Sequence, residues 1–239
     1  YKQTILGPAW FFIQPALTTI MYMVVFGGIA GISTDSLPQP LFYLAGIVVW
    51  QYFSDCLNKT SSTFTANQGI FGKVYFPRLI VPLATVTSNL VRMGIQLILF
   101  IAVYIYYLLI GVQVAPNAYV LLLPLLFVML AGLSLGFGII ISSMTTKYRD
   151  LTILFSFIVS LWMYATPVIY PLSTMSADKQ WIMALNPVTA IIEAFKYGTM
   201  GVGTFSWGML GYSFTFMLVL MAIGIVVFNK VQRSFMDTV

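Results

Sequence analysis

The sequence is poor in the side chains that enzymes use for chemistry. It has no histidine, few carboxylates and a single cysteine, Cys56. One cysteine excludes an internal disulfide, and the lack of histidine excludes Ser-His pairs and mixed Cys/His metal sites. The segment GIFGKV at 69–74 has a Gly-x-x-Gly-Lys spacing but lacks the length and the Ser/Thr of a phosphate-binding loop. We therefore expect no catalytic residue, no metal site and no cofactor site in this chain.

Charge is equally scarce, and apolar residues take its place. The 239 residues are 60% hydrophobic and 7% charged, whereas a soluble domain is about a quarter charged and under half apolar. This apolar excess does not fit into one globular core, which indicates an integral membrane protein. The net charge of +5 is scattered between apolar segments and gives no nucleic-acid footprint. We expect one membrane domain over 1–239.

Six apolar segments are long enough to cross a hydrocarbon core, which takes about 20 helical residues. Helices are expected because a lipid-exposed backbone must satisfy its own hydrogen bonds. Turn-forming stretches separate these segments. The sequence thus predicts an all-α fold with six transmembrane helices, near 9–31, 41–66, 82–111, 118–145, 152–170 and 207–229.

The basic residues fall on alternate sides of these segments. With the N-terminus inside, nine of the eleven Lys and Arg residues lie on the inner side, and only Lys179 and Lys196 lie outside. Cytoplasmic loops of membrane proteins carry such an excess of positive charge. We therefore predict a multi-pass protein with both termini in the cytoplasm.

One region between the fifth and sixth spans does not fit a simple span count. Ser176 is a candidate cap for a helix ending near Leu185, and Asn186-Pro187 then breaks the chain and starts a second helix. Each apolar run has about 10–12 residues, which is too short to span and is typical of re-entrant helices. We predict a helix-break-helix hairpin over 176–199 that enters the membrane from the outer side.

Two opposite charges lie within predicted spans, Asp55 and Arg92. At 1.5 Å per residue they lie at similar depth on consecutive antiparallel helices. An interhelical ion pair is the favoured hypothesis, with Lys59 as a competing partner one turn from Asp55. A coupling-ion site or a substrate-headgroup site is the alternative.

Aromatic residues make up 16% of the chain and form three clusters. A belt of rings at the membrane interface explains most of them. A second interpretation is that some rings line a conduit for sugars, whose C–H faces stack on aromatic rings. The clusters are Trp10-Phe11-Phe12, Trp50-Tyr52-Phe53 and Phe155-Phe157-Trp162-Tyr164.

The stretch NQGIFGKVYFPRLIVP (67–82) is a basic, aromatic segment between two apolar runs. Asn67 is a candidate cap for a short helix that Pro77 ends. We expect about two turns on the cytoplasmic side, exposing Lys73 and the aromatic residues. This helix either rests on anionic lipid or docks a protein partner. Its candidate docking residues are Ile70, Phe71, Lys73, Val74 and Tyr75.

Four segments carry a resemblance to a known family. They are YKQTILGPAWFFIQP (1–15), KYRDL (147–151), TPVIYPL (166–172) and LNPV (185–188). In this order, they resemble the ABC-2 permeases that export bacterial polysaccharides such as O-antigen, capsule and teichoic acid. The match runs along the whole chain. The resemblance also implies an amphipathic interface helix ahead of Tyr1.

The resemblance implies roles for specific residues. The helix at 67–76 would couple to an ATPase, and aromatic residues of the first and fifth helices would line the glycan path. The cytoplasmic portal for a lipid pyrophosphate headgroup would include Tyr1, Lys2, Leu6 and Gly7. The glycan path would include Trp10, Phe11, Phe12, Phe155, Trp162 and Tyr164. The external gate would include Pro167, Trp181, Asn186 and Pro187.

The resemblance further implies partners and a place in the cell. A second copy of this chain and two separate ABC ATPase subunits, which bind ATP and Mg, would complete the exporter in the bacterial inner membrane. The substrate would be an undecaprenyl-pyrophosphate-type lipid-linked glycan. The chain itself would be no enzyme. The alternatives are an ABC-2 exporter of small hydrophobic compounds, an ion-coupled carrier, and a membrane-embedded glycosyl- or acyltransferase. Scarce buried charge argues against the carrier, and the lack of acid–base groups against the transferase.

Overall fold

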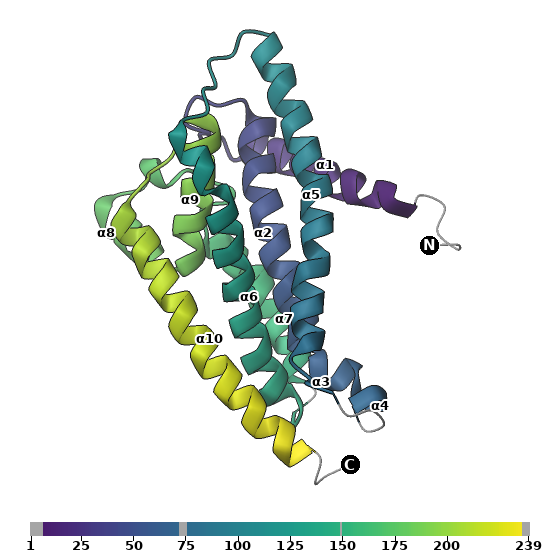
Figure 1. The fold of residues 1–239 in the computed structure, drawn as a ribbon. Coiled ribbons are helices and arrows are strands. Elements are labelled where there is room, and N and C mark those ends of the chain that lie inside the picture. Colours follow the sequence, from purple (N-terminus) through teal and green to yellow (C-terminus); the bar gives the residue numbers. More distant parts are fainter. Residues whose placement is uncertain (1–6, 72–75, 149, 236–239) are drawn as a thin grey trace.

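The computed structural model shows a bundle of long helices (Figure 1). It describes residues 7–71, 76–148 and 150–235, without the side chains of 233–235. All regular structure in these ranges is helical, as the sequence predicts. The longer helices are α1 (Trp10–Tyr22), α2 (Gln39–Ser61), α5 (Ile80–Leu109), α6 (Leu123–Thr145), α7 (Leu151–Trp162), α8 (Ala177–Ala184), α9 (Pro187–Met200) and α10 (Trp207–Phe235).

Shorter elements complete the chain. A 3-10 turn (Gly7–Ala9) precedes α1, and a π-helical segment (Met23–Ile29) extends it. Two short helices follow α2, namely α3 (Thr63–Ala66) and α4 (Gln68–Phe71). The remaining turns are η3 (Ala118–Leu122), η4 (Met163–Ala165) and η5 (Leu172–Thr174).

Helix α2 forms the centre of the bundle. Its residues from Leu41 to Trp50 are all buried, and it packs against α1, α5, α6, α7 and α9. Burial on every side explains why its sequence shows little amphipathic pattern. The predicted segment 41–66 is broken at Ser62, where α2 ends and α3 begins. There the hydroxyls of Ser61 and Thr63 donate to backbone carbonyls one turn earlier, which competes with a continuous helix.

Helices α6 and α10 form the most extensive helix pair in the bundle. Gly132 and Gly136 lie one turn apart on α6, directly against Met217 and Leu220 of α10. A Cβ atom added at Gly132 would lie 2.5 Å from the Met217 sulfur. Small residues at this spacing allow two helices to approach closely, as in membrane proteins generally.

Four of the six predicted spans are apolar and long enough to cross a membrane. They are Gly7–Ile29, Ile80–Leu109, Ala118–Thr145 and Trp207–Gln232. Helix α2, at 23 residues, has the length but is more polar and lies inside the bundle. The helical run Leu151–Ala165 is shorter than a span.

The predicted span 152–170 is wrong at its C-terminal end. Helix α7 stops at Trp162, and one 3-10 turn carries the chain to Ala165. Thr166 is extended, with φ −132° and ψ 141°. Pro167 explains this, because the proline ring disfavours helical conformation in the residue before it.

The predicted helix-break-helix pattern of 176–199 is confirmed as α8 and α9. Asn186 caps α9 by accepting a hydrogen bond from the Val188 backbone N–H, and Pro187 occupies the first turn. Ser176 stands at the N-cap of α8, but its side chain makes no capping bond. Whether the hairpin enters a membrane stays a prediction.

The described charges separate toward the two ends of the bundle. The α4 end holds the C-terminal ends of α2, α6 and α10, with Lys59, Lys147 and Lys230 (Figure 1). Helices α8 and α9 lie toward the other end, with Lys179 and Lys196. The inner and outer charges of the predicted topology thus lie toward opposite ends of the bundle. The orientation in the membrane stays a prediction.

Candidate functional site

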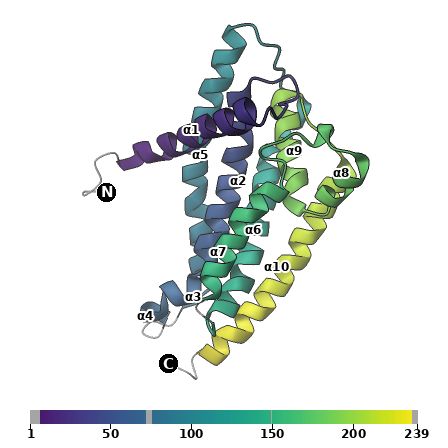
Figure 2. The ribbon, with the colours of Figure 1, turned by 180° about the vertical axis from the view of Figure 1, so that it is seen from behind.

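A cleft with both polar and apolar lining opens where α1 leaves the bundle. In Figures 1 and 2, α1 crosses the bundle obliquely, and its first residues point away from the other helices. We call the space below it the α1–α5 cleft, which measures about 590 Å³. It is lined by Phe11, Lys59, Ile80, Val81, Ala84, Thr85, Ser88, Asn89, Val91 and Arg92.

The predicted ion pair lies at this cleft. Arg92 Nη1 of α5 donates to Asp55 Oδ2 of α2 across 2.5 Å. Arg92 Nη2 donates to Gln14 Oε1 of α1 across 2.7 Å, and the guanidinium lies 5.3 Å from the centre of the Phe11 ring. One arginine thus joins three helices. The interhelical pair of Asp55 and Arg92 is confirmed.

Lys59 makes no direct ion pair with Asp55 in the described structure. Its Nζ donates to Asn89 Oδ1 of α5 across 2.7 Å. Asn89 is buried, and its amide nitrogen donates to the Thr85 carbonyl one turn earlier, which fixes its oxygen toward Lys59. Lys59 itself is exposed at the cleft and has no carboxylate within ion-pair distance among the described residues.

The predicted docking helix lies partly outside the described residues, and its described part is more buried than expected. Of the predicted segment 67–76, the structure describes 67–71 and Phe76, with α4 over Gln68–Phe71. Lys73, Val74 and Tyr75 lie outside the described ranges. Ile70 is 54% exposed, but Phe71 is only 2% exposed. The expectation that its aromatic residues are exposed is therefore wrong for Phe71, whose ring packs against Phe64 and Phe76.

Arg78 fixes α4 to the rest of the bundle. Its Nη2 donates to the Phe71 carbonyl across 3.1 Å, and its Nη1 donates to the Gln232 carbonyl of α10 across 3.2 Å. Burial lowers the pKa of this guanidinium, although an arginine keeps its charge at neutral pH. A displacement of α4 would therefore reach both α5 and α10.

The six rings of the predicted glycan path do not form one cluster. Trp10, Phe12 and Tyr164 are exposed. Trp162 is packed between α2 and α6, with ring centres 5.3 Å from Phe53 and 5.2 Å from Phe137. Phe11 lies at Arg92 and Phe155 is half-buried, and none of the ring pairs in the described structure joins two of the six. Their role stays a prediction.

Three of the four predicted gate residues come together. Asn186 Nδ2 donates to the Ala165 carbonyl and to Thr166 Oγ1, at 2.9 and 2.8 Å. Pro187 follows it, and Pro167 is buried one residue after Thr166. Trp181 lies apart on α8 and is 66% exposed, beside Tyr212 of α10.

Sequence reasoning missed a buried charge pair on α9. Lys196 Nζ lies 4.0 Å from Glu193 Oε1, and each residue is 1% exposed. Lys196 also donates to the Pro167 carbonyl across 2.6 Å and lies 3.8 Å from the centre of the Phe42 ring. Glu193 Oε2 accepts from the Thr204 N–H and hydroxyl. Opposite charges at i and i+3 within an apolar helix were the available signal.

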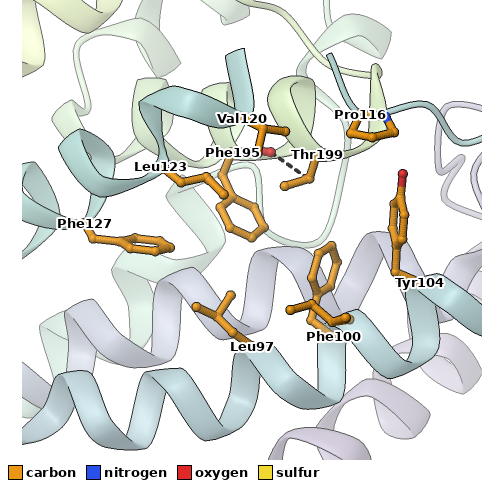
Figure 3. A pocket seen from close by; sticks show the side chains of 10 residues that line it. Leu97, Phe100, Tyr104, Pro116, Val120, Leu123, Phe127, Phe195 and Thr199 are labelled. Atoms are coloured by element: carbon orange, nitrogen blue, oxygen red, sulfur yellow. Dashed lines mark hydrogen bonds between the residues drawn. The ribbon is translucent and has the colours of Figure 1, made fainter. Parts of the chain in front are cut away.

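A second cavity, of about 260 Å³, lies between α5, α6 and α9 (Figure 3). Apolar and aromatic side chains point into it, with Phe100 of α5 facing Phe195 of α9 at a ring-centre distance of 5.6 Å. Thr199 is the polar exception besides Tyr104, and its hydroxyl donates to the Phe195 carbonyl. The cavity therefore offers no charge to a ligand.

Of the predicted portal, only Gly7 is described, and it begins the turn before α1 with φ +42°. Tyr1, Lys2 and Leu6 lie outside the described residues. No group of three or more metal-ligating side chains occurs in the described ranges.

Comparison with known proteins agrees with this architecture. The model of the ABC-2 type transporter family matches residues 1–200. The chain belongs to this family. This ABC-2 family member is 25% identical over 237 residues to the O-antigen export system permease protein RfbA of Klebsiella pneumoniae, covering 99% of this chain and 89% of that protein.

Two further relatives have related names. The RfbA protein of Myxococcus xanthus is 27% identical over 199 residues, which is 82% of this chain and 74% of that protein. The polysialic acid transport protein KpsM of Escherichia coli is 24% identical over 238 residues, which is 98% of this chain and 89% of that protein. The ABC-2 family member is thus similar to polysaccharide export permeases along nearly its whole length.

Proposed function

We propose that this chain is the transmembrane half of an ATP-driven exporter of lipid-linked polysaccharide. The observation that carries the proposal is the end-to-end similarity to permeases named for O-antigen export and polysialic acid transport. Two copies of the chain would form the conduit in the bacterial inner membrane, with both termini cytoplasmic. Six segments would cross the membrane, and α8 and α9 would form an outer re-entrant hairpin.

The α4 end offers the coupling element. Two separate ABC ATPase subunits would bind ATP and Mg and would receive the segment 67–76, on which Ile70 is exposed. Arg78 supports this role, because it joins the Phe71 carbonyl to α10 and lies just before α5. A push on α4 would therefore move two long helices together. This chain supplies no hydrolytic chemistry.

Co-purification with the ATPase tests the coupling. The exporter ATPase is co-expressed with the tagged chain, either unchanged or carrying Ile70→Asp. A buried carboxylate at a docking surface costs several kcal/mol, so Ile70→Asp should abolish co-purification and surface glycan. Trp181→Asp alters an equally exposed apolar side chain at the other end and should leave co-purification intact. Absence of any ATPase with the unchanged chain would refute the proposal.

Export of small hydrophobic compounds is the second candidate, and the cavity of Figure 3 favours it. Its uncharged lining suits an apolar ligand of modest size. Phe195→Trp would fill this cavity. It should abolish drug resistance conferred by the exporter if the cavity holds substrate, and should leave surface glycan unchanged if the exporter moves polysaccharide.

A further inference from the structure

The α1–α5 cleft has the chemistry of an anion site. Of its lining residues, Lys59 and Arg92 are cationic and none is acidic. Asp55, which pairs with Arg92, is the nearest carboxylate, so the group carries a net charge of about +1. The remaining described acids lie outside the cleft, namely Asp35, Asp150, Asp178 and Glu193.

Several hydrogen-bond donors at the cleft are not used. Lys59 has three N–H donors, and one of them goes to Asn89. Arg92 has five, and its Nε is buried without a partner in the described structure. The Ser88 hydroxyl lines the cleft and donates to no described residue. A phosphate group accepts several such bonds, and charge-assisted bonds are about twice as strong as neutral ones.

The surroundings of the cleft indicate a lipid rather than a soluble anion. Val91 and Ile80 also line it, and they are 68% and 52% exposed. Further along α5, Ile98 and Ile101 are exposed on a helix that is long and apolar enough to span a membrane. A ligand here would place its charge beside Lys59 and Arg92 and its chain along these apolar side chains.

The position of Lys59 and Arg92 along the bundle agrees with binding of a lipid headgroup. Lys59 lies in the last turn of α2, and Arg92 lies about 18 Å along α5, at 1.5 Å per residue. Both charges therefore lie in the half of the bundle nearer to α4. The long side chain of Lys59 can reach the interface, where lipid phosphates lie, and Arg92 lines the same cleft at greater depth.

We propose that the α1–α5 cleft binds the phosphate or diphosphate group of an anionic lipid, with Lys59 and Arg92 as its cationic donors. Lys59 has no carboxylate within ion-pair distance among the described residues, and two of its three N–H donors are unused. Arg92 is held in place by Asp55 and Gln14 and offers its remaining N–H groups. The identification of this lipid as the exporter's substrate rests on the proposed function, whereas the binding site itself does not.

A binding measurement on the full chain in nonionic detergent tests the site. The probe is tritiated geranylgeranyl diphosphate, and the variants are Lys59→Gln and the control Lys230→Gln, an exposed lysine of α10 away from the cleft. One charge-assisted bond corresponds to about tenfold in affinity. Lys59→Gln should weaken binding by about that factor, and Lys230→Gln should change it by less than about twofold.

A second variant tests the cleft without leaving an unpaired charge that could unfold the chain. Asp55→Asn/Arg92→Gln removes both charges of the pair together, so no unpaired charge is left, and it should also weaken binding. Equal affinity of the unchanged chain, Lys59→Gln and this double variant would overturn the site. Geranylgeraniol, which has the same chain without phosphate, should compete poorly, and equal competition by it would also overturn the site.

Competition distinguishes the sources of the phosphate. Stronger competition by inorganic pyrophosphate than by unlabelled geranylgeranyl diphosphate would overturn the lipid assignment. Equal competition by phosphatidylglycerol micelles would support the site and assign it to bilayer lipid. Preference for the diphosphate lipid would support the site and assign it to substrate. None of these outcomes depends on whether an ATPase co-purifies, so the site and the proposed function fail separately.

Discussion

The described residues include two pairs of opposite charges in very different surroundings. Glu193 and Lys196 lie on one helix, each 1% exposed, and their remaining bonds go to Thr204 and Pro167. Asp55 and Arg92 lie on two helices, their side chains are 23% and 17% exposed, and they border an open cleft. Both pairs cost desolvation energy, but only the second keeps donors that a ligand could reach.

The difference indicates different tasks. The α9 pair is closed on all sides, since the Phe42 ring covers the ammonium and the 165–168 loop lies against α2. Gly46 makes that approach possible, because a Cβ atom there would lie 2.8 Å from the Val168 carbonyl oxygen. Such a pair positions backbone segments. The Asp55–Arg92 pair instead holds a cation at a surface.

The largest loss of stability is expected from breaking the Glu193–Lys196 pair. Lys196→Met retains most of the side-chain volume but leaves Glu193 buried without a cation and the Pro167 carbonyl without its donor. Removing one partner of a buried ion pair costs about 3–5 kcal/mol. We expect a loss of that size in the free energy of unfolding, measured with SDS in detergent micelles.

Two further variants show which interaction is responsible for this loss of stability. Glu193→Gln/Lys196→Met removes both charges, and the new amide can still accept from Thr204, so it should regain most of the stability. Lys179→Met changes an exposed lysine of α8 and should have little effect. A double variant no more stable than Lys196→Met would show that the Pro167 bond, rather than the charge pair, carries the stability.

An intermediate loss of stability is expected for replacing Asn186, at the same end of the bundle. Asn186→Ala removes the cap of α9 and the side-chain donor to Ala165 and Thr166. A lost cap and one lost hydrogen bond together cost roughly 2 kcal/mol. We expect that decrease in the free energy of unfolding. Ser176→Ala is the matched control, because Ser176 occupies an N-cap without a capping bond, and a similar loss there would contradict the assignment.

A smaller loss of stability is expected from breaking the Asp55–Arg92 pair. Arg92→Gln leaves Asp55 uncompensated, but the Asp55 side chain is 23% exposed, whereas Glu193 is 1% exposed. The cost should be about 1 kcal/mol, closer to that of a surface pair than of a buried one. A double-mutant cycle with Asp55→Asn measures the coupling directly. A coupling as large as that of Glu193 and Lys196 would remove the distinction between the two pairs.

The sequence predicted the elements whose cause is local. Apolar segments gave the long helices, and Asn186-Pro187 gave the break before α9. The equal depth of Asp55 and Arg92 followed from helix rise alone. Each of these conclusions requires only chain neighbours or a single pair of adjacent helices.

The misses have tertiary causes. Phe71 was expected to be exposed on a helix at the surface, but Phe64, Phe76 and Arg78 enclose it. The charge pattern identifies Lys196 only as an outer charge, because nothing in the sequence indicates that Pro167 and Phe42 lie against it. The cleft depends on the angle at which α1 leaves the bundle, which periodicity does not specify.

The smallest expected effect on stability is the one that separates structure from binding. Lys59 is exposed, and its loss removes a single bond to Asn89. Lys59→Gln should therefore change the free energy of unfolding by less than about 0.5 kcal/mol, while it weakens binding of the diphosphate lipid. The SDS unfolding curve and the lipid affinity are measured on the same preparation. A stability loss near that of Arg92→Gln would mean that Lys59 serves helix packing, whereas an unchanged curve with weakened binding assigns its charge to the ligand.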